Sequence, residues 1–284
     1  MRQATLGPGC LILRKPPRRQ PALMNGMSTP PFARLRNCIA RLGWRGSAWL
    51  AVARLLQALP ANIASLQCYQ FVAQAVAPGS LCHGRGKAIT VVPSSDPATL
   101  PGRPPRPPEV LRQRQAQGAQ CLVAHHASVG TGIVGWLWLL QGGCLEDEVR
   151  ARYVLASRQS CWDLDVWVHP EQRGALVLAR LWEEANARLH AQGVRWSCSR
   201  ISRFNAESLA AHARIGTVHL GTATFLRCGR WQWMLASLPP YLHLSRHASS
   251  VPALHFDTSH LPYYPSLELT CRILKHSTTP SMKP

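Results

Sequence analysis

The first third of the sequence lacks negative charge: residues 1–95 hold 12 Lys and Arg side chains, and the first carboxylate is Asp96. Much of the formal net charge of +19 therefore lies outside the best-patterned part of the chain. Residues 1–37 are rich in Pro and Arg and show no periodic apolar face that would offset the entropy of ordering. We expect a disordered basic extension there, with a targeting peptide and a nucleic-acid arm as alternative roles.

The chain also lacks an uninterrupted apolar run of the length that a membrane span needs, about 20 residues. Residues 46–60 are apolar, but Arg54 lies in their middle and Pro60 ends them. Residues 121–140 are long enough, but His125, His126 and the sequence Ser-Val-Gly-Thr-Gly divide them into two short runs. We therefore predict a core or surface helix in the first stretch, a hairpin in the second, and no membrane span.

Ten cysteines are present without a Cys-x-x-Cys pair or a spacing typical of zinc ligands. Scattered thiols favour a reducing compartment, so we predict a cytoplasmic protein with mostly buried cysteines. The adjacent His125 and His126 point to opposite sides of a strand and would not easily chelate one ion, so no metal is expected. The sequence contains neither the Gly-x-Ser-x-Gly nucleophile elbow of α/β-hydrolases nor a Walker loop, so it does not indicate an α/β-hydrolase or a P-loop protein.

Turn residues divide the rest of the chain into alternating strands and helices. We expect strands at 67–76, 87–93, 120–140 (a hairpin), 148–156, 161–169, 193–202 and 222–236 (a hairpin). We expect helices at 46–60, 109–118, 174–191 and 205–216. This order predicts an α/β domain with a mixed sheet at 85–240, after a helical and strand lead-in at 38–84. Residues 241–284 lack a periodic pattern of apolar residues and are expected to form a loosely ordered tail.

The strand Asp-Leu-Asp-Val-Trp-Val-His-Pro (163–170) continues through Glu-Gln-Arg-Gly into a long helix, and a further strand is followed by Asn205 and a second helix. Together with the closing hairpin, this order resembles the GNAT superfamily of N-acetyltransferases over roughly 85–240. The resemblance implies a mostly antiparallel central sheet flanked by helices and splayed between the strands at 161–169 and 193–202. It also implies acetyl-CoA or another acyl-CoA as co-substrate.

In that superfamily a Gln/Arg-x-x-Gly-x-Gly/Ala turn binds the pyrophosphate of CoA with backbone amides, which lack intrahelical partners at a helix N-terminus. Leu176 and Leu178 here replace the two small residues that let the phosphates approach closely. The resemblance implies a pyrophosphate site at Arg173, Gly174, Ala175, Leu176, Val177 and Leu178, and pantetheine contacts from the backbone of Val166 and Val168. The alternative is a strand–turn–helix junction that binds nothing.

A second family motif, Asn-x-x-Ala-x-x-Leu-Tyr-x-x-x-Gly, is similar in spacing to residues 205–216, where His212 stands in place of Tyr. The resemblance implies that Asn205 touches the CoA arm and that His212 is the general acid for the leaving thiolate. An imidazole with a pKa near 6.5 suits acid catalysis at neutral pH. Asn205 and Gly216 are also good helix-capping residues, so His212 is alternatively an ordinary helix side chain.

Alternation along 161–169 places Asp163 and Asp165 on one face of a strand. Burial and mutual repulsion would raise the pKa of one of them, which suits a base that takes a proton from an amine; Asp165, nearer the strand end, is preferred. Pairing with Arg150 or Arg152 would instead make them a structural ion cluster. The acidic run Glu146, Asp147 and Glu148 either holds a cationic substrate or is solvated, and we favour the second.

These patterns predict an acyltransferase that moves an acetyl or other short acyl group from CoA to a small-molecule or protein amine by direct attack on the thioester. The altered phosphate motif supports an alternative, a GNAT-shaped protein that has lost catalysis and serves as a binding or regulatory module. The basic N-terminal arm supports a third and weaker hypothesis, a nucleic-acid-associated protein. The final hairpin presents a sheet edge at which two copies could pair.

Overall fold

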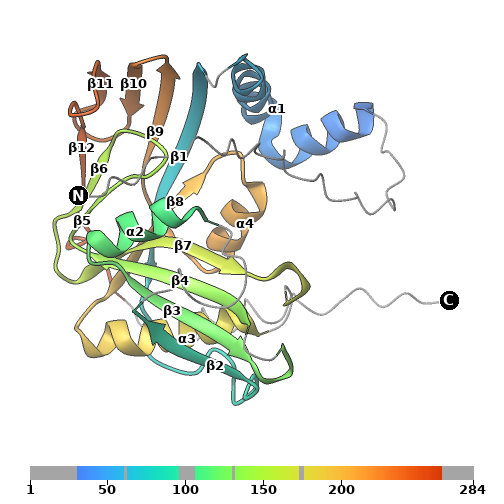
Figure 1. Cartoon of the computed structure of the whole chain (residues 1–284), viewed down its shortest axis with the longest axis vertical. Coiled ribbons are helices and arrows are strands. Elements are labelled where there is room, and N and C mark those ends of the chain that lie inside the picture. Colours follow the sequence, from blue (N-terminus) through green and yellow to red (C-terminus); the bar gives the residue numbers. More distant parts are fainter. Residues whose placement is uncertain (1–30, 61–62, 96–105, 130–131, 173–175, 264–284) are drawn as a thin grey trace, which may run out of the picture.

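The computed structural model describes residues 31–60, 63–95, 106–129, 132–172 and 176–263 (Figure 1). The described helices are α1 (Pro31–Gln57), α2 (Pro108–Ala116), α3 (Val177–Ala191) and α4 (Ala206–Arg214). The strands are β1 (Ala64–Ala75), β2 (Ile89–Ser94), β3 (Gln120–His126), β4 (Ile133–Gln141), β5 (Gly143–Leu145), β6 (Arg152–Leu155), β7 (Ser160–Val168), β8 (Trp196–Ser202), β9 (Val218–Cys228), β10 (Trp231–Ala236), β11 (Leu242–Ser245) and β12 (Ala253–Phe256).

Nine strands form one sheet in the order β11-β10-β9-β1-β8-β7-β4-β3-β2, and β12-β6-β5 form a second, smaller sheet. Within the large sheet β7 and β8 are parallel, and the other paired strands are antiparallel. The mixed, mostly antiparallel sheet flanked by helices that the sequence predicts is therefore confirmed. In the part of the chain that the structure describes, none of the helices combines the length and the apolar character that crossing a membrane takes.

Helix α3 covers one face of the large sheet, and α2 with the small sheet covers the other (Figure 1). On the first face Val177, Leu181 and Leu189 of α3 pack among aliphatic side chains of β2, β3 and β4. On the second face the core is aromatic, with Trp162 of β7 beside Phe256 of β12 at 5.1 Å between ring centroids. Both faces are therefore buried, and β7 contributes side chains to each.

Strand β1 lies in the middle of the large sheet, between β8 and β9. Its side chains Tyr69 and Phe71 are buried in the aromatic core. The predicted domain boundary at residue 85 is therefore wrong, because the two halves of the sheet meet at a strand from the predicted lead-in, 38–84. The order of strands along the sequence cannot reveal this, since β1 pairs with strands more than a hundred residues later.

The chain after Pro240 is more ordered than the sequence predicts. Strand β11 extends the sheet beside β10, and β12 pairs in parallel with β6. Leu254 and Phe256 of β12 are buried in the aromatic core. The expectation of a loose tail from residue 241 is wrong as far as residue 263, because strands of four residues among Ser and His carry too few apolar positions to show a period. Residues 264–284, like 1–30, lie outside the described residues. The expected disordered extension at 1–37 is wrong for residues 31–37, which belong to α1.

The parallel pairing of β7 with β8 is short. It begins at Ser160–Trp196 and ends at Asp163–Ser199, although β7 continues to Val168 and β8 to Ser202. Beyond Asp163 and Ser199 the two described strands have no mutual pairing, so the sheet opens there. The predicted splay between these two strands is confirmed.

Candidate functional site

A β-bulge in β7 changes the expected arrangement of its two aspartates. The register against β4 shifts between Asp163 and Asp165, so that Leu164 is an extra residue. Leu164 packs with the aromatic core and with the tryptophans of β4, and Asp165 accepts a hydrogen bond from Trp136 on the same side. Asp163 instead bonds Ser199, on the side of α3. The prediction that both aspartates share a face is wrong, because the bulge interrupts the alternation.

Asp163 is buried at the closed end of the opening, in the last pair of the β7–β8 ladder. Its Oδ2 accepts a hydrogen bond of 2.9 Å from Ser199 Oγ. Burial raises the pKa of Asp163 to about 7, and the charge of Asp165 adds to the rise against the hydrogen bond from Ser199. Near neutral pH this carboxyl is therefore able both to accept and to release a proton.

Asp165 has the opposite electrostatic character. Two nitrogens of Arg106 bind its carboxylate at 3.0 and 2.7 Å, and Arg114 Nη1 binds it at 2.9 Å. Burial alone would raise its pKa, but the hydrogen bonds and charges of Arg106 and Arg114 lower it below the usual value. Asp165 is thus an ionised, fully paired structural group, so the geometry favours Asp163 over Asp165 as a base. The expected partners Arg150 and Arg152 are not the ones observed.

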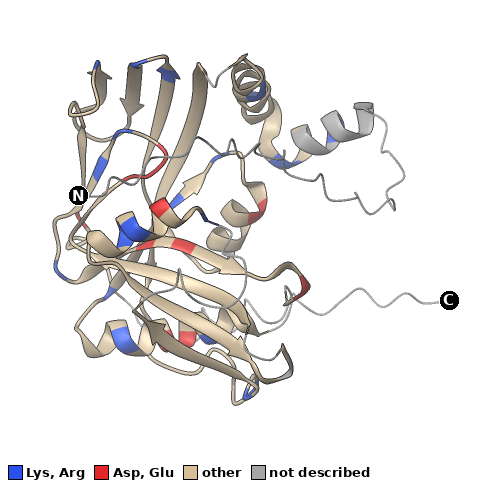
Figure 2. Cartoon of the chain, in the orientation of Figure 1, with Lys and Arg blue, Asp and Glu red and all other residues tan. Residues whose placement is uncertain are grey.

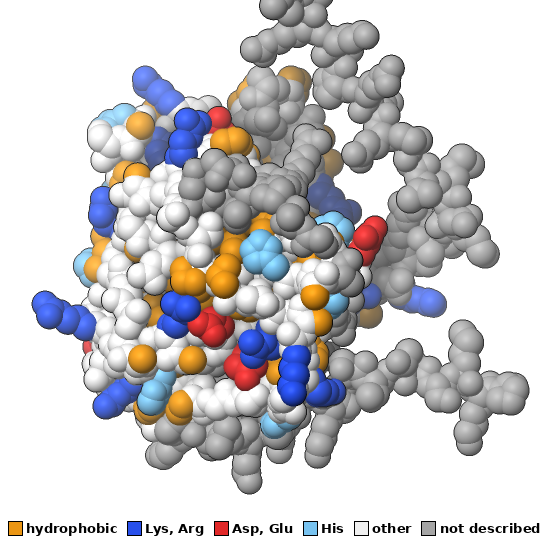
Figure 3. Space-filling view, turned by 60° about the horizontal axis from the view of Figure 1, so that its bottom comes forward, with side chains coloured by type: hydrophobic (Ala, Val, Ile, Leu, Met, Phe, Trp, Pro, Cys, Tyr) orange, Lys and Arg blue, Asp and Glu red, His pale blue; other side chains and the backbone are white. Residues whose placement is uncertain are grey.

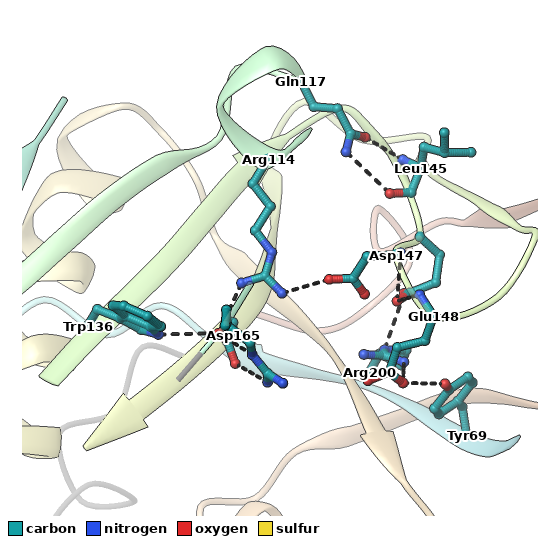
Figure 4. Close-up of polar contacts among 11 residues, drawn as sticks. Tyr69, Arg114, Gln117, Trp136, Leu145, Asp147, Glu148, Asp165 and Arg200 are labelled. Carbon is teal, nitrogen blue, oxygen red and sulfur yellow. Dashed lines mark hydrogen bonds and ion pairs between the residues drawn. The ribbon is translucent and has the colours of Figure 1, made fainter. Parts of the chain in front are cut away.

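The pairing of Asp165 continues as a chain of ionic contacts across the opening between β7 and β8 (Figure 4). Arg114 Nη2 binds Asp147 Oδ2 at 2.9 Å, in the loop that follows β5. Next to Asp147, Glu146 lies 3.3 Å from Arg200 Nε on β8. We name this set the charge network, and its members are Arg106, Arg114, Glu146, Asp147, Glu148, Asp165 and Arg200.

Arg200 forms the β8 end of the charge network. Its Nη1 binds Glu148 Oε2 at 2.8 Å, and its guanidinium lies 4.3 Å from the ring centroid of Tyr69, whose hydroxyl donates to Glu148 at 2.6 Å. Since Arg114 reaches Asp165 on β7 and Arg200 belongs to β8, the network bridges both strands on the α2 side of the sheet.

The acidic run 146–148 is therefore not a solvated loop, contrary to expectation. The Glu146 side chain is buried, and burial raises its pKa to about 8, with Arg200 opposing and Asp147 adding to the rise. The pKa of Asp147 is lowered: burial opposes this, but Glu146 donates to it and Arg114 stabilises its charge. Glu146 is therefore the second carboxyl of the site that titrates near neutral pH.

His212 lies on α4 with its Nδ1 2.7 Å from the carbonyl oxygen of Ser208. A carbonyl only accepts hydrogen bonds, so Nδ1 is assigned the proton of the neutral ring. Burial lowers the pKa of His212, and the Ser208 carbonyl opposes this. A neutral imidazole whose proton is already donated is a poor general acid, so this geometry favours the helix-side-chain alternative. Asn205 Oδ1 accepts from the Ser208 amide at 3.0 Å and is the N-cap of α4.

Four of the predicted cofactor residues come together near the start of α3. Val166, Val168 and Leu176 pack against the cluster that contains Val177, while Leu178 is exposed. Helix α3 begins at Val177, with Leu176 as its N-cap, after a 3₁₀ turn at Pro170–Gln172. Arg173, Gly174 and Ala175, the predicted centre of the pyrophosphate turn, lie outside the described residues.

The loop before β2 lies against this end of α3. A Cβ built on Gly86, whose φ is +73°, would lie 3.1 Å from Arg180 Cγ and 3.4 Å from Leu176 Cβ. Gly86 stands between Arg85 and Lys87 in the sequence, and Arg85 Nε donates to the Cys82 carbonyl at 3.4 Å. Sequence reasoning missed the contact of Gly86 with α3, since nothing local in the glycine-rich stretch 84–86 indicates which helix it meets.

Among the described residues, no three His, Cys, Asp or Glu side chains are grouped to hold a metal ion.

Neither a protein-family model nor a curated protein matches the sequence. Solved structures with some likeness include a conserved protein of unknown function from Staphylococcus epidermidis, with 11% identity over 62% of this chain and 67% of that one and a TM-score of 0.40. A GCN5-related N-acetyltransferase from Sphaerobacter thermophilus has 18% identity, coverages of 63% and 57%, and a TM-score of 0.33. A tandem GNAT protein from the clavulanic acid biosynthesis pathway has 18% identity, coverages of 61% and 55%, and a TM-score of 0.35. The chain spans little more than half the length of the last two proteins.

Proposed function

We propose that this chain is an acyltransferase that moves an acetyl or other short acyl group from CoA to an amine. The observation that carries the proposal is the opening between β7 and β8, with Asp163 at its closed end. Where the two strands separate, backbone groups on their facing edges lose their ladder partners. An extended pantetheine arm carries amide groups and is able to replace those partners, as a peptide does when it adds to a sheet edge. Val166 and Val168 would supply the β7 side.

The chemistry asked of the chain is limited to one proton transfer. The amine nitrogen attacks the thioester carbonyl, a C–N bond forms, the C–S bond breaks, and CoA leaves as a thiolate. The attacking nitrogen must lose a proton, and Asp163, with its pKa raised to about 7, is suited to accept it at neutral pH. Ser199 holds the carboxylate in place.

The anionic end of CoA would lie at the start of α3. The first amides of a helix lack intrahelical partners and carry partial positive charge, which favours phosphate groups. Arg85 and Lys87 add formal positive charge beside Gly86, which packs on Leu176.

Six cysteines are buried free thiols: Cys68, Cys82, Cys121, Cys144, Cys161 and Cys198. Buried free thiols support the expected location in a reducing compartment, the cytoplasm.

The second candidate is a GNAT-shaped binding module without turnover. The charge network favours it, because it bridges β7 and β8 on the α2 side, and because Asp165 has its acceptors filled. His212 also has its ring proton committed to Ser208. This arrangement would allow CoA to bind on the α3 side while an acceptor is kept out on the other.

Nucleic-acid binding has less support. Lys and Arg of the described part are spread over several helices and strands in Figure 2 instead of forming one stripe. On the face that comes forward in Figure 3, acidic and basic side chains lie next to one another. Helix α3 accounts for two ion pairs, Arg180–Glu183 at 2.8 Å and Arg188–Glu184 at 2.7 Å.

Titration of the purified chain with CoA tests the proposal. Ligand that binds the folded state alone stabilises it by about 2.7 kcal/mol at a concentration of 100 Kd, so the melting temperature is expected to rise. Acetyl-CoA with a panel of small-molecule and peptide amines is then expected to release CoA thiol. A melting temperature unchanged at millimolar CoA would reject both candidates. A rise in melting temperature without thiol release would select the binding module.

A further inference from the structure

Helix α1 carries several of its large apolar side chains on the side away from the protein. Residues after the break at Gly43 pack on β1 through Ala53, which is 2% exposed, and the half-buried Leu56, both in contact with the cluster of Leu66 and Cys68. The outward side holds Trp44, 69% exposed, and Leu55, 70% exposed. A surface helix of a globular protein normally has the reverse arrangement, with its large apolar residues toward the core.

The exposed apolar residues form a continuous stripe. With about 3.6 residues per turn, Trp44, Val52 and Leu55 project to one side of the helix, and Leu59 follows them at its C-terminal end. We name these four residues the α1 stripe. Arg45 projects along one border of the stripe and Arg54 along the other. An apolar stripe with cationic borders is typical of helices that lie in the plane of a membrane interface.

The charge of the segment indicates which surface the stripe meets. Residues 31–60 contain five arginines and no Asp or Glu. The guanidinium of Arg45 lies 5.2 Å from the ring centroid of Trp44, so the cation and the indole would lie at a similar depth in a membrane interface. Tryptophan and arginine at one level suit the headgroup region, where the ring is half immersed and the cation meets lipid phosphate.

We propose that α1 docks the protein on an anionic lipid bilayer, with the α1 stripe entering the boundary between headgroups and acyl chains. Nucleic acid would satisfy the arginines but would leave Val52 and Leu55 in water. A second copy of this chain would bring together two surfaces of a protein with a formal net charge of +19. An anionic bilayer offers both an apolar phase and negative charge.

The proposal is tested by flotation of the full chain with vesicles of phosphatidylcholine alone or with added phosphatidylglycerol. Binding is expected to the anionic vesicles and to weaken as salt is raised, because the arginine contribution is screened. The double variant Trp44→Ser, Leu55→Ser is expected to lose binding about tenfold or more, since both side chains insert. Leu235→Ser with Leu242→Ser, which removes two exposed apolar side chains from β10 and β11, is the matched control and is expected to bind normally.

A charge-matched pair separates the arginine borders from net charge. Arg45→Gln with Arg54→Gln should reduce binding to anionic vesicles several-fold, whereas Arg152→Gln with Arg158→Gln, on the surface elsewhere, should not. Equal loss in both pairs would overturn the docking orientation. Absence of binding to anionic vesicles at low salt would overturn the proposal, and so would a dimer in light scattering that the Trp44→Ser, Leu55→Ser variant dissociates.

Discussion

Ser199 Oγ donates a hydrogen bond of 2.9 Å to Asp163 Oδ2 across the last pair of the parallel β7–β8 ladder. This contact marks the point at which two neighbouring strands of the sheet separate. It also fixes a buried carboxyl with a pKa raised to about 7 at the end of the opening. The separation of the two strands and a carboxyl group that titrates near neutral pH therefore occur at the same residue, Asp163.

Replacement of Asp163 by Asn tests the proposed base. The amide keeps the size of the side chain and still accepts from Ser199, but it cannot take a proton from an amine. Turnover is expected to fall by about 10²- to 10⁴-fold, while the affinity for CoA stays the same. A variant with the turnover of the native chain would exclude Asp163 as the base.

Ser199→Ala provides the companion measurement. The hydrogen bond from Ser199 lowers the pKa of Asp163 against the effect of burial, so its removal should raise that pKa. The rising limb of the pH–rate profile is expected to move to higher pH, with the maximal rate largely kept. A purely structural role of Ser199 would lower stability without moving the profile.

The contribution of Asp163 and Glu146 to stability is expected to decrease as pH rises from about 4 to 8. Burial raises the pKa of Asp163 to about 7 and of Glu146 to about 8, so over this window the folded chain binds protons that the unfolded chain has released. The Asp163→Asn variant lacks one of these groups. Between pH 5 and pH 8 its free energy of unfolding should therefore fall by less than that of the native chain. Urea denaturation at the two pH values measures this, and equal losses in both proteins would contradict the assignment.

The charge network is expected to depend on Arg114. Its removal takes a buried guanidinium from Asp147 and leaves Asp165 with Arg106 and Trp136, and loss of one member of a buried pair typically costs about 3–5 kcal/mol. Arg114→Met should therefore lower the free energy of unfolding by that order. Arg112→Gln, in an exposed pair with Glu109 on the same helix, should change it by less than about 1 kcal/mol. Similar effects of the two substitutions would show that the network does not stabilise the fold.

His212→Asn tests the choice between acid and helix side chain. The asparagine amide is able to replace Nδ1 as the donor to Ser208, so the helix contact is retained and the titratable ring is lost. Turnover is expected to stay within about twofold of the native value. A loss of about a hundredfold or more, with CoA affinity unchanged, would instead restore His212 as the general acid.

The order of helices and strands was predictable from the sequence because the spacing of apolar residues within each element is a local property. The strand at 161–169 and the helix that follows the next turn lie within a few residues of their expected bounds, and the splay is what the resemblance to the GNAT superfamily implies. Long-range pairing was not predictable: nothing in 64–75 indicates that β1 separates β8 from β9. Strand β12 was missed because its burial depends on β6, a partner about a hundred residues away.

The site was predictable in its membership but not in its chemistry. Asp163 and Asp165 were both identified, but the bulge at Leu164 turns them to opposite faces, and an insertion of one residue in a register leaves no mark in the sequence. Arg106 and Arg114, which fix the ionised state of Asp165, come from a segment more than fifty residues away. The choice between the two aspartates therefore required tertiary contacts.

Amide hydrogen exchange with and without acetyl-CoA tests the central claim most directly, since the claim is that an acyl-CoA arm occupies the opening between β7 and β8. Backbone amides of 164–168 and 200–202 lie beyond the last β7–β8 ladder pair. Those that point into the opening, and not toward β4 or β1, are expected to become protected when acetyl-CoA is added. Amides of β10 and β11, at the far edge of the sheet, should not change. Unchanged exchange in 164–168 and 200–202 at saturating acetyl-CoA would contradict the account.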